Sequence, residues 1–235
     1  MEQDINKKIF DEHSANYSRE VDDVVAFSGL KADFFTRVKA ERLLEYLGDH
    51  FGDVSSLKLL DLGCGVGTYE TLLNGHVGSV TGIDVSEESI EKARQNNPQN
   101  TYLSYDGRKL PFEDNSFDAV FAICVMHHVP VENWSRFVAE AMRVTKKGGA
   151  FAIFEHNPWN PLTQYVVSSC EFDADAVLLT PKRIQQVFEE GGVKQASRKV
   201  DYMLAIPPKG GVLKAADRML SKIAVGAQYA VFSIK

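Results

Sequence analysis

The segment from Lys58 to Glu70 (KLLDLGCGVGTYE) constrains the fold of this chain more than any other. A short apolar run containing Asp61 leads into glycines at the alternate positions 63, 65 and 67. Glycine lacks a Cβ atom, so it permits a sharp turn and a close approach of a ligand to the backbone. The residues that follow can open a helix, whose free N–H groups favour negative charge. A strand, a glycine turn and a helix in this order predict the nucleotide-binding unit of an open α/β sheet.

Predicted strands and helices alternate along most of the chain. Apolar, β-rich runs predict strands at residues 57–62, 77–85, 101–105, 117–124, 150–155, 193–206 and 228–234. Helical spacing, with capping residues such as Ser86 and Pro181, predicts helices at 33–47, 86–96, 131–144, 181–191 and 212–223. Prolines 158 and 161 predict irregular structure after residue 157. The alternation predicts a parallel sheet covered by helices on both faces.

Length, composition and charge fit one soluble domain over residues 1–235. The hydrophobic fraction is 44%, and the formal net charge of −6 argues against a general nucleic-acid-binding protein. The cysteines at 64, 124 and 170 have no metal-ligand spacing, so we expect reduced thiols in a cytoplasmic protein. The first residues lack the apolar core of a signal peptide, and no apolar run reaches about 18 residues, so no transmembrane helix is expected.

The glycine turn does not match two common nucleotide-binding signatures. The NAD signature G-x-G-x-x-G needs a third glycine where Thr68 stands, and a Walker loop needs a Gly-Lys-Ser/Thr that does not follow. The run Leu60–Gly67 (LDLGCGVG) instead closely resembles the first motif of class I S-adenosylmethionine-dependent methyltransferases. The resemblance extends from about residue 10 to residue 192, and is to the small-molecule, methyltransferase type 11 or quinone-biosynthesis-like group.

The resemblance implies a Rossmann-like, seven-stranded, mostly parallel sheet with helices on both faces and an antiparallel C-terminal strand. It also implies S-adenosyl-L-methionine as cofactor and S-adenosyl-L-homocysteine as product. The N-terminal segment Phe10–Tyr17 matches a family element that folds over the cofactor, so residues 1–50 are expected to form lid helices; a frayed amphipathic helix is the alternative. The residues expected to bind the cofactor are Tyr17, Asp61, Gly63, Cys64, Gly65, Gly67, Asp84, Val85, Asp106, Gly107 and Cys124.

Two acids have specific expected roles. Asp84 ends the second predicted strand, and its two carboxylate oxygens can accept two ribose hydroxyls; the alternative is an acid that only complements a helix dipole. In the family, an acid after the third strand accepts from the adenine amino group, and the next residue donates a backbone N–H. Asp106 and Gly107 hold those places, and a plain Asp-Gly turn is the alternative.

Four further side chains are candidates for catalysis. His127 and His128 follow the fourth predicted strand and could supply a general base, or could instead shape the cofactor pocket or pack a helix. Glu155 and His156 end the fifth strand, where they could deprotonate a hydroxyl or only bind it. No metal is expected, because no third or fourth ligand stands at the right sequence spacing.

The implied reaction is an in-line displacement at the sulfonium methyl group, in which the enzyme mainly aligns the acceptor and excludes water. The expected acceptor is a small molecule, apolar, aromatic or lipid-linked, methylated on oxygen or carbon. Residues 157–180 and 207–226 are expected to build its pocket, with the apolar stripe over residues 212–223 in the core. Residues 193–235 carry a net charge of +6, which suggests weak contact with an anionic membrane surface or only a solvated face.

Other functions stay open at the level of the sequence. A cofactor-binding partner protein without transfer activity would show the same motifs. An NAD(P)-dependent oxidoreductase is disfavoured by Thr68. Methylation of proteins or nucleic acids is disfavoured by the acidic charge and by the lack of an Asn/Asp-Pro-Pro-Tyr/Phe signature. The sequence does not determine the acceptor or the oligomeric state.

Overall fold

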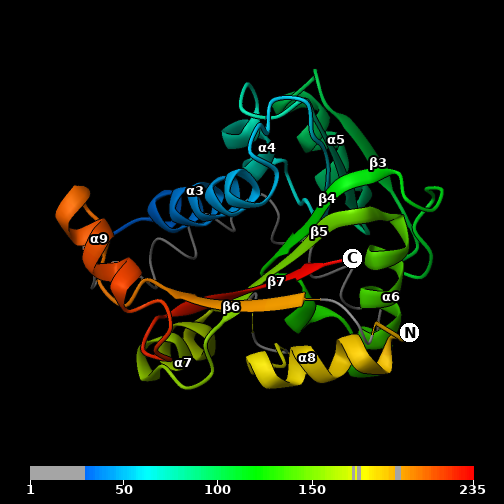
Figure 1. The fold of residues 1–235 in the computed structure, drawn as a ribbon. Coiled ribbons are helices and arrows are strands. Elements are labelled where there is room, and N and C mark those ends of the chain that lie inside the picture. The colour runs from blue at the N-terminus through cyan, green and yellow to red at the C-terminus, as the bar shows by residue number, and fades with distance from the viewer. Residues whose placement is uncertain (1–29, 171–172, 174–175, 194–196) are drawn as a thin grey trace.

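A computed structural model describes residues 30–170, 173, 176–193 and 197–235 of the chain. Within these residues, seven strands form one sheet in the order β3-β2-β1-β4-β5-β7-β6 (Figure 1). The strands are β1 (Lys58–Leu62), β2 (Ser79–Asp84), β3 (Thr101–Ser104), β4 (Phe117–Ile123), β5 (Thr145–His156), β6 (Ser197–Met203) and β7 (Gln228–Ile234). The helices are α3 (Ala32–Phe51), α4 (Thr68–Leu73), α5 (Glu87–Asn96), α6 (Trp134–Val144), α7 (Pro161–Ser169), α8 (Pro181–Glu190) and α9 (Gly211–Met219).

The pairing of the strands confirms the predicted fold class. β1 pairs in parallel with β2 and with β4, β2 with β3, and β4 with β5. β7 lies antiparallel between β5 and β6, so the C-terminal strand runs against the others as expected. The chain passes from β1 outward to β2 and β3 and then returns to β4. The order of strands therefore reverses between β1 and β4, where open α/β sheets bind ligands at the carboxyl ends of their strands.

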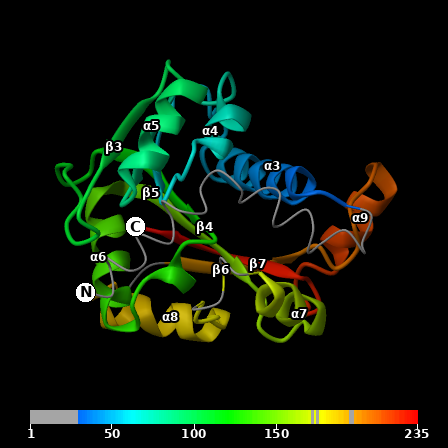
Figure 2. The same ribbon diagram turned by 180° about the vertical axis from the view of Figure 1, so that it is seen from behind.

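Helices cover both faces of the sheet, with α3, α4 and α5 on one side and α6 and α8 on the other (Figures 1 and 2). Successive residues of one strand supply the two cores. Leu59 packs in the cluster that includes Leu43 of α3, whereas Leu60 packs in the cluster that includes Val138 of α6. Because both faces are buried, the strands read as continuous apolar runs rather than as alternating ones.

Helix α7 was not predicted. The two prolines around it were interpreted as breakers, but Pro161 stands at the first helical position, where its missing N–H does not disturb the helix. Asn160 caps this helix, because its side-chain oxygen accepts the N–H groups of Leu162 and Thr163 at 3.0 and 3.1 Å. A cap followed by proline is a helix-start signal that the sequence did contain.

Strand β6 ends at Met203, three residues before the predicted end. Leu204 has φ 63°, outside the extended region. The carboxylate of Asp217 in α9 accepts the N–H groups of Leu204 at 3.3 Å and of Ala205 at 2.8 Å. Those N–H groups therefore bond to a side chain instead of a neighbouring strand, and the chain turns away from the sheet.

The apolar stripe of α9 is not part of the core, so that expectation was wrong. Val212 is 85% exposed and Met219 is 83% exposed, and the only buried residue of this helix is the acidic Asp217. The reason lies in what α9 packs against: its inner face meets charged side chains of α3 rather than an apolar surface. No helix among the described residues has the length and hydropathy needed to span a membrane.

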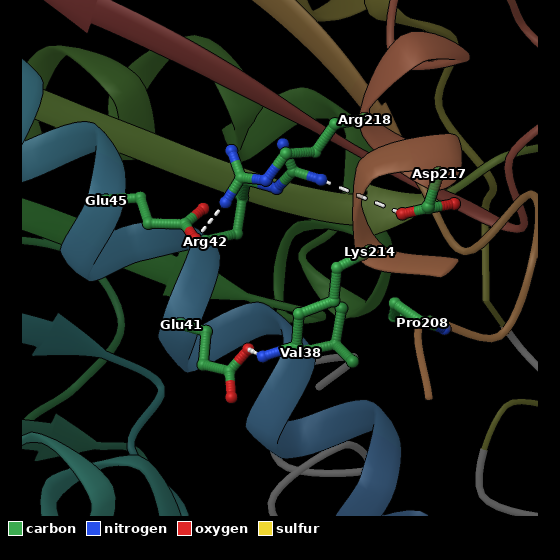
Figure 3. A pocket seen from close by; sticks show the side chains of 8 residues that line it. All are labelled: Val38, Glu41, Arg42, Glu45, Pro208, Lys214, Asp217 and Arg218. Carbon is green, nitrogen blue, oxygen red and sulfur yellow. Dashed lines mark hydrogen bonds and ion pairs between the residues drawn. The ribbon is translucent and has the colours of Figure 1, made fainter. Parts of the chain in front are cut away.

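A charged hollow lies between α3 and α9 (Figure 3). Lys214 pairs with Glu41 at 2.6 Å, and Arg218 pairs with Glu45. Arg42, which is buried, lies 3.0 Å from Asp201 of β6 and 3.7 Å from Asp217 of α9. The charges around the hollow therefore compensate one another and join α3, α9 and β6. None of the residues that line it belongs to the glycine turn or to the ends of β4 and β5.

Candidate functional site

The predicted site residues that fall within the described chain gather at one edge of the sheet. Each follows or ends one of the parallel strands β1 to β5, and the carboxyl ends of those strands lie side by side. The sheet therefore brings together residues that are up to about a hundred positions apart in the sequence. Tyr17 lies outside the described residues.

The glycine turn after β1 is held against the end of β2. The N–H groups of Gly63 and Cys64 donate to the carbonyl of Ile83 at 2.8 and 3.1 Å. Gly65 has φ 52°, and a Cβ atom added there would meet no atom within 4 Å. Gly67 has φ 81°, and a Cβ atom there would lie 2.8 Å from Asn97 Nδ2. Gly67 is therefore needed for packing, whereas Gly65 leaves a space that a ligand can enter.

Asp84 links the end of β2 to this turn. Its Oδ2 accepts the N–H of Gly65 at 2.9 Å, and its Oδ1 accepts the N–H of Ser86 at 2.9 Å. Ser86 in turn caps α5, as predicted, by accepting the N–H of Ser89 at 3.1 Å. Asp84 is buried, so backbone donors hold its carboxylate in one orientation at the edge of the glycine turn.

Three buried carboxyl groups lie around the turn: Asp61, Glu70 and Asp84. Burial, with Glu70 and Asp84 nearby, raises the pKa of Asp61 well above its ordinary range. Burial likewise raises the pKa of Glu70 to about 8. Oδ2 of Asp61 and both carboxyl oxygens of Glu70 have no hydrogen-bond partner among the described residues. This region is therefore suited to a ligand that brings positive charge and hydrogen-bond donors.

Cys124 stands directly after β4 with φ 56°, a strained conformation for a residue other than glycine. The ammonium of Lys39, from α3, lies 3.4 Å from its sulfur. Although burial opposes ionisation, Lys39 and His156 hold the pKa of the Cys124 thiol at about 6. Burial instead raises the pKa of Cys64, whose thiol donates to the Gly65 carbonyl at 3.7 Å.

The histidines after β4 meet the acid at the end of β5. Nδ1 of His127 lies 2.5 Å from Oε2 of Glu155, and Oε1 of Glu155 accepts the N–H of Met126 at 2.9 Å. Although burial opposes the charged form, the Glu155 carboxylate raises the pKa of His127 well above its ordinary range. Asp173 lies 3.6 Å from Nε2 of His127 and 3.4 Å from Nε2 of His128. Glu155 therefore contacts His127 through one oxygen and the Met126 N–H through the other, an arrangement that orients the His127 ring.

The other predicted residues lie at the same edge. Val85 follows β2 and is half-buried, and Asp106 follows β3 and is exposed. Oδ1 of Asp106 accepts the N–H of Arg108 at 2.9 Å, and Gly107 has φ 72°. His156 is half-buried, with Nδ1 3.5 Å from Nε2 of Gln228.

Sequence reasoning missed Lys39, Glu70 and Asp173. Lys39 stands four residues from both Phe35 and Leu43, so helical spacing places it on the apolar face of its helix, and this was an available signal. Glu70 stands in the first turn of the helix after the glycines, which is an ordinary place for an acid. Asp173 belongs to a stretch without a periodic pattern, and no sequence signal connects it to the histidines.

The comparisons with known proteins agree with this geometry. Residues 60–153 match the model of a methyltransferase domain family. A phthiotriol/phenolphthiotriol dimycocerosates methyltransferase from Mycobacterium ulcerans is 32% identical over 117 residues, which are 48% of this chain and 42% of that protein. A sterol 24-C-methyltransferase from Gibberella zeae is 34% identical over 47% of this chain and 30% of that protein. The chain therefore spans less than half the length of these two relatives.

Solved structures share the fold over most of the chain. A methyltransferase from Thermotoga maritima, described as a possible histamine N-methyltransferase, has a TM-score of 0.66 at 18% identity, covering 96% of this chain and 98% of that one. Geranyl diphosphate C-methyltransferase from Streptomyces coelicolor, solved with S-adenosyl-L-homocysteine, has a TM-score of 0.59 at 15% identity over 83% and 78% of the two chains. Residues 60–153, which run from β1 into β5, therefore match a methyltransferase domain family, and the chain as a whole has the fold of class I S-adenosylmethionine-dependent methyltransferases.

Proposed function

We propose that this chain is an enzyme that transfers a methyl group from S-adenosyl-L-methionine to a small apolar acceptor. One observation carries the proposal: the Asp84 carboxylate is fixed by Gly65 and Ser86 at the edge of a glycine turn that is open at Gly65. The fold and the family domain supply the context. The match of residues 60–153 to a methyltransferase domain family supports the activity, and a transfer assay tests it.

The residues at the carboxyl ends of the parallel strands fit the cofactor. Asp84 would accept ribose hydroxyls, and the open face at Gly65 would let the cofactor approach the backbone. Asp106 and Gly107 would contact the adenine. The buried acids Asp61 and Glu70 suit the positively charged amino acid end, because a cation would compensate their burial. When bound, S-adenosyl-L-methionine supplies a methyl group on a good leaving group.

The protein side of the reaction is mainly positioning. The glycine turn, clamped to the end of β2, and Cys124, held by the backbone after β4, are fixed before any ligand binds, which lowers the entropic cost of alignment. Glu155 orients His127 through Nδ1. A hydroxyl acceptor also needs its proton removed, and His156, half-buried at the end of β5, is our candidate for that base.

The two segments expected to build the acceptor pocket lie side by side. The side chain of Asn157 donates to the carbonyl of Gly226 at 2.7 Å, and Thr163 donates to the carbonyl of Ala227 at 2.7 Å. These bonds join the start of α7 to the segment after α9, and Figures 1 and 2 show both helices at the same end of the molecule. Each of the two segments carries exposed large apolar side chains: Trp159, Leu162 and Tyr165 in the first, and Val212, Leu213, Met219, Ile223 and Val225 in the second.

This surface supports an apolar acceptor, such as a hydroxylated lipid or an isoprenoid. Contiguous exposed patches of large apolar side chains mark ligand-binding grooves or interaction surfaces. Relatives and neighbours named for dimycocerosate, sterol and geranyl diphosphate methylation fit the same class of acceptor. We propose methylation on oxygen or carbon of such a molecule.

Calorimetry with S-adenosyl-L-homocysteine and with NAD tests the cofactor. We expect binding of the former only; binding of NAD alone would support an oxidoreductase and overturn the proposal. Transfer of a labelled methyl group to a panel of phenolic lipids, sterols and isoprenoids then tests the activity. If the cofactor binds but no member of a broad panel is methylated, a partner protein without transfer activity becomes the better description.

A further inference from the structure

A second cluster of side chains stands beside the proposed cofactor site. One ring nitrogen of His127, one of His128 and a carboxylate oxygen of Asp173 all lie within 4.8 Å of one another. Both histidine side chains are buried, and Asp173 is 11% exposed. The histidines follow β4, so the cluster lies at the carboxyl edge where ligands bind in such folds.

The distances in this cluster suit a shared ion better than direct hydrogen bonds. Asp173 lies 3.6 Å from His127 and 3.4 Å from His128, beyond the usual N–H···O range of about 2.7–3.2 Å. Ligand atoms about 2.1 Å from a tetrahedral zinc ion are about 3.4 Å apart, whereas octahedral neighbours would be about 3.0 Å apart. The observed separations match the tetrahedral arrangement.

A second feature is independent of those distances. Histidines that bind metals almost always donate the other ring N–H to a carboxylate, a backbone carbonyl or a water molecule, which fixes the ring. Nδ1 of His127 lies 2.5 Å from Glu155, and Glu155 is itself held by the N–H of Met126 at 2.9 Å. With Nδ1 as the donor to Glu155, Nε2 of His127 faces Asp173, and a metal ion bound there would replace the proton on Nε2.

The backbone holds the third member in place. The N–H of Asp173 donates to the carbonyl of Cys170 at 3.1 Å, and the carbonyl of Asp173 accepts the N–H of Ala176 at 3.0 Å. Val177, which follows Ala176, donates its backbone N–H to the carbonyl of His127 at 2.9 Å. The backbone that carries Asp173 is therefore tied to the same turn that carries the histidines. The carboxylates of Glu155 and Asp173, which are buried or nearly buried, favour a cation between the rings.

We propose that His127, His128 and Asp173 bind one divalent transition-metal ion, with Zn²⁺ as the best fit. Two imidazoles and one carboxylate are a ligand set of catalytic zinc sites, which keep a fourth position for water or substrate. That position would take an oxygen of the acceptor and favour its deprotonated form. This last role rests on the proposed function, but metal binding itself does not. The expectation of no metal from sequence spacing failed to consider Asp173, which is distant in the chain.

Cobalt titration of the full-length, chelator-treated protein tests the site directly. We expect one Co²⁺ per chain with visible absorption bands of tetrahedral intensity, and displacement of these bands by Zn²⁺. Asp173→Asn and His128→Gln should each weaken Zn²⁺ binding at least tenfold. Glu155→Gln keeps all three ligands and should weaken it about 10- to 100-fold, which identifies Glu155 as a positioning residue.

His76→Gln is the matched control, because His76 is exposed and remote from these residues in the sequence, and it should bind Zn²⁺ as the wild type does. Circular dichroism of each variant shows whether it is folded. Absence of the cobalt bands in the wild type, or unchanged affinity in Asp173→Asn, would overturn the proposal and leave an ion pair that holds residue 173 against His127. Calorimetry with S-adenosyl-L-homocysteine gives a separate readout, so failure of the metal site and failure of the methyltransferase assignment are distinguishable.

Discussion

Gly65 donates its backbone N–H to the carboxylate of Asp84 across 2.9 Å, which joins the glycine turn after β1 to the end of β2. The two residues are 19 positions apart, and the parallel pairing of β1 with β2 brings them together. One acid therefore shapes the turn and faces the proposed ribose site, so its replacement should act on both.

Asp84→Ala should lower the affinity for S-adenosyl-L-homocysteine about 10- to 100-fold, because hydrogen bonds to a charged group contribute about 1.5–3 kcal/mol. The fold should persist with a modest loss of stability. Asp53→Ala is the matched control: exposed Asp53 accepts the N–H of Ser55 at 2.9 Å, as Asp84 accepts that of Ser86. Calorimetry measures the affinity, and wild-type binding by Asp84→Ala would remove the ribose assignment.

Glu70→Gln should stabilise the protein without cofactor, and more so at higher pH. The pKa of Glu70 is raised from 4.5 to about 8 by burial, so between these values the folded protein holds a proton that the unfolded chain releases. Wild-type stability therefore falls as the pH rises through this window. Compared with the wild type, the variant should unfold at a similar temperature at pH 5 and at a clearly higher temperature at pH 8. The free energy of unfolding should differ by on the order of a few kcal/mol at pH 8. The same change at exposed Glu132 should have no such effect, and a pH-independent difference would contradict the prediction.

Cys124 should react with iodoacetamide with a midpoint near pH 6, because Lys39 and His156 favour its thiolate against the effect of burial. Lys39→Met should move that midpoint upward, and S-adenosyl-L-homocysteine should protect the thiol. Mass spectrometry of the labelled peptides measures each rate. Buried Cys64, whose pKa is raised, is the internal reference and should label slowly. A rate that rises only above pH 8 would argue against the Lys39 contact.

Arg42→Met should destabilise the fold by about 3–5 kcal/mol, because it leaves Asp201 and Asp217 buried without their cationic partner. Chemical denaturation measures the free energy of unfolding. The control is Arg37→Met in the same helix: Arg37 pairs with Asp33 at 2.8 Å, but both side chains are more than 60% exposed. That change should cost less than about 1 kcal/mol, and equal effects of the two changes would contradict the importance of burial.

Helix α9 should contribute to any contact with lipid surfaces. Val212 and Met219 are seven residues apart, so they lie on one face of the helix, and both are more than four-fifths exposed. Replacing both with Gln should reduce sedimentation with anionic vesicles at low salt, whereas Val131→Gln, at an exposed residue outside α9, should not. No sedimentation of the wild type would end the hypothesis of membrane contact.

The signals that succeeded in the sequence were local. The cap at Ser86 and the helical spacing over residues 33–47 depend on neighbours within a few residues, and both were confirmed, although α3 continues to Phe51. Helix α7 shows a local signal that was misinterpreted, since Asn160 and Pro161 start a helix rather than prevent one. The predicted site residues among those that the structure describes share one edge of the sheet, because the carboxyl ends of parallel strands lie side by side.

The sequence by itself determined the strand-turn-helix unit, the order of the seven strands and the resemblance to methyltransferases, since glycine conformations and apolar periodicity act over short distances. Only the tertiary structure decided which charges meet. It placed Asp173 against His127 and His128, Glu70 among the acids of the glycine turn, and Arg42 between α9 and β6. It also left the apolar side of α9 exposed, because the opposite side pairs with charges of α3. Burial and electrostatic coupling depend on groups distant in the chain, and no local pattern of residues encodes them.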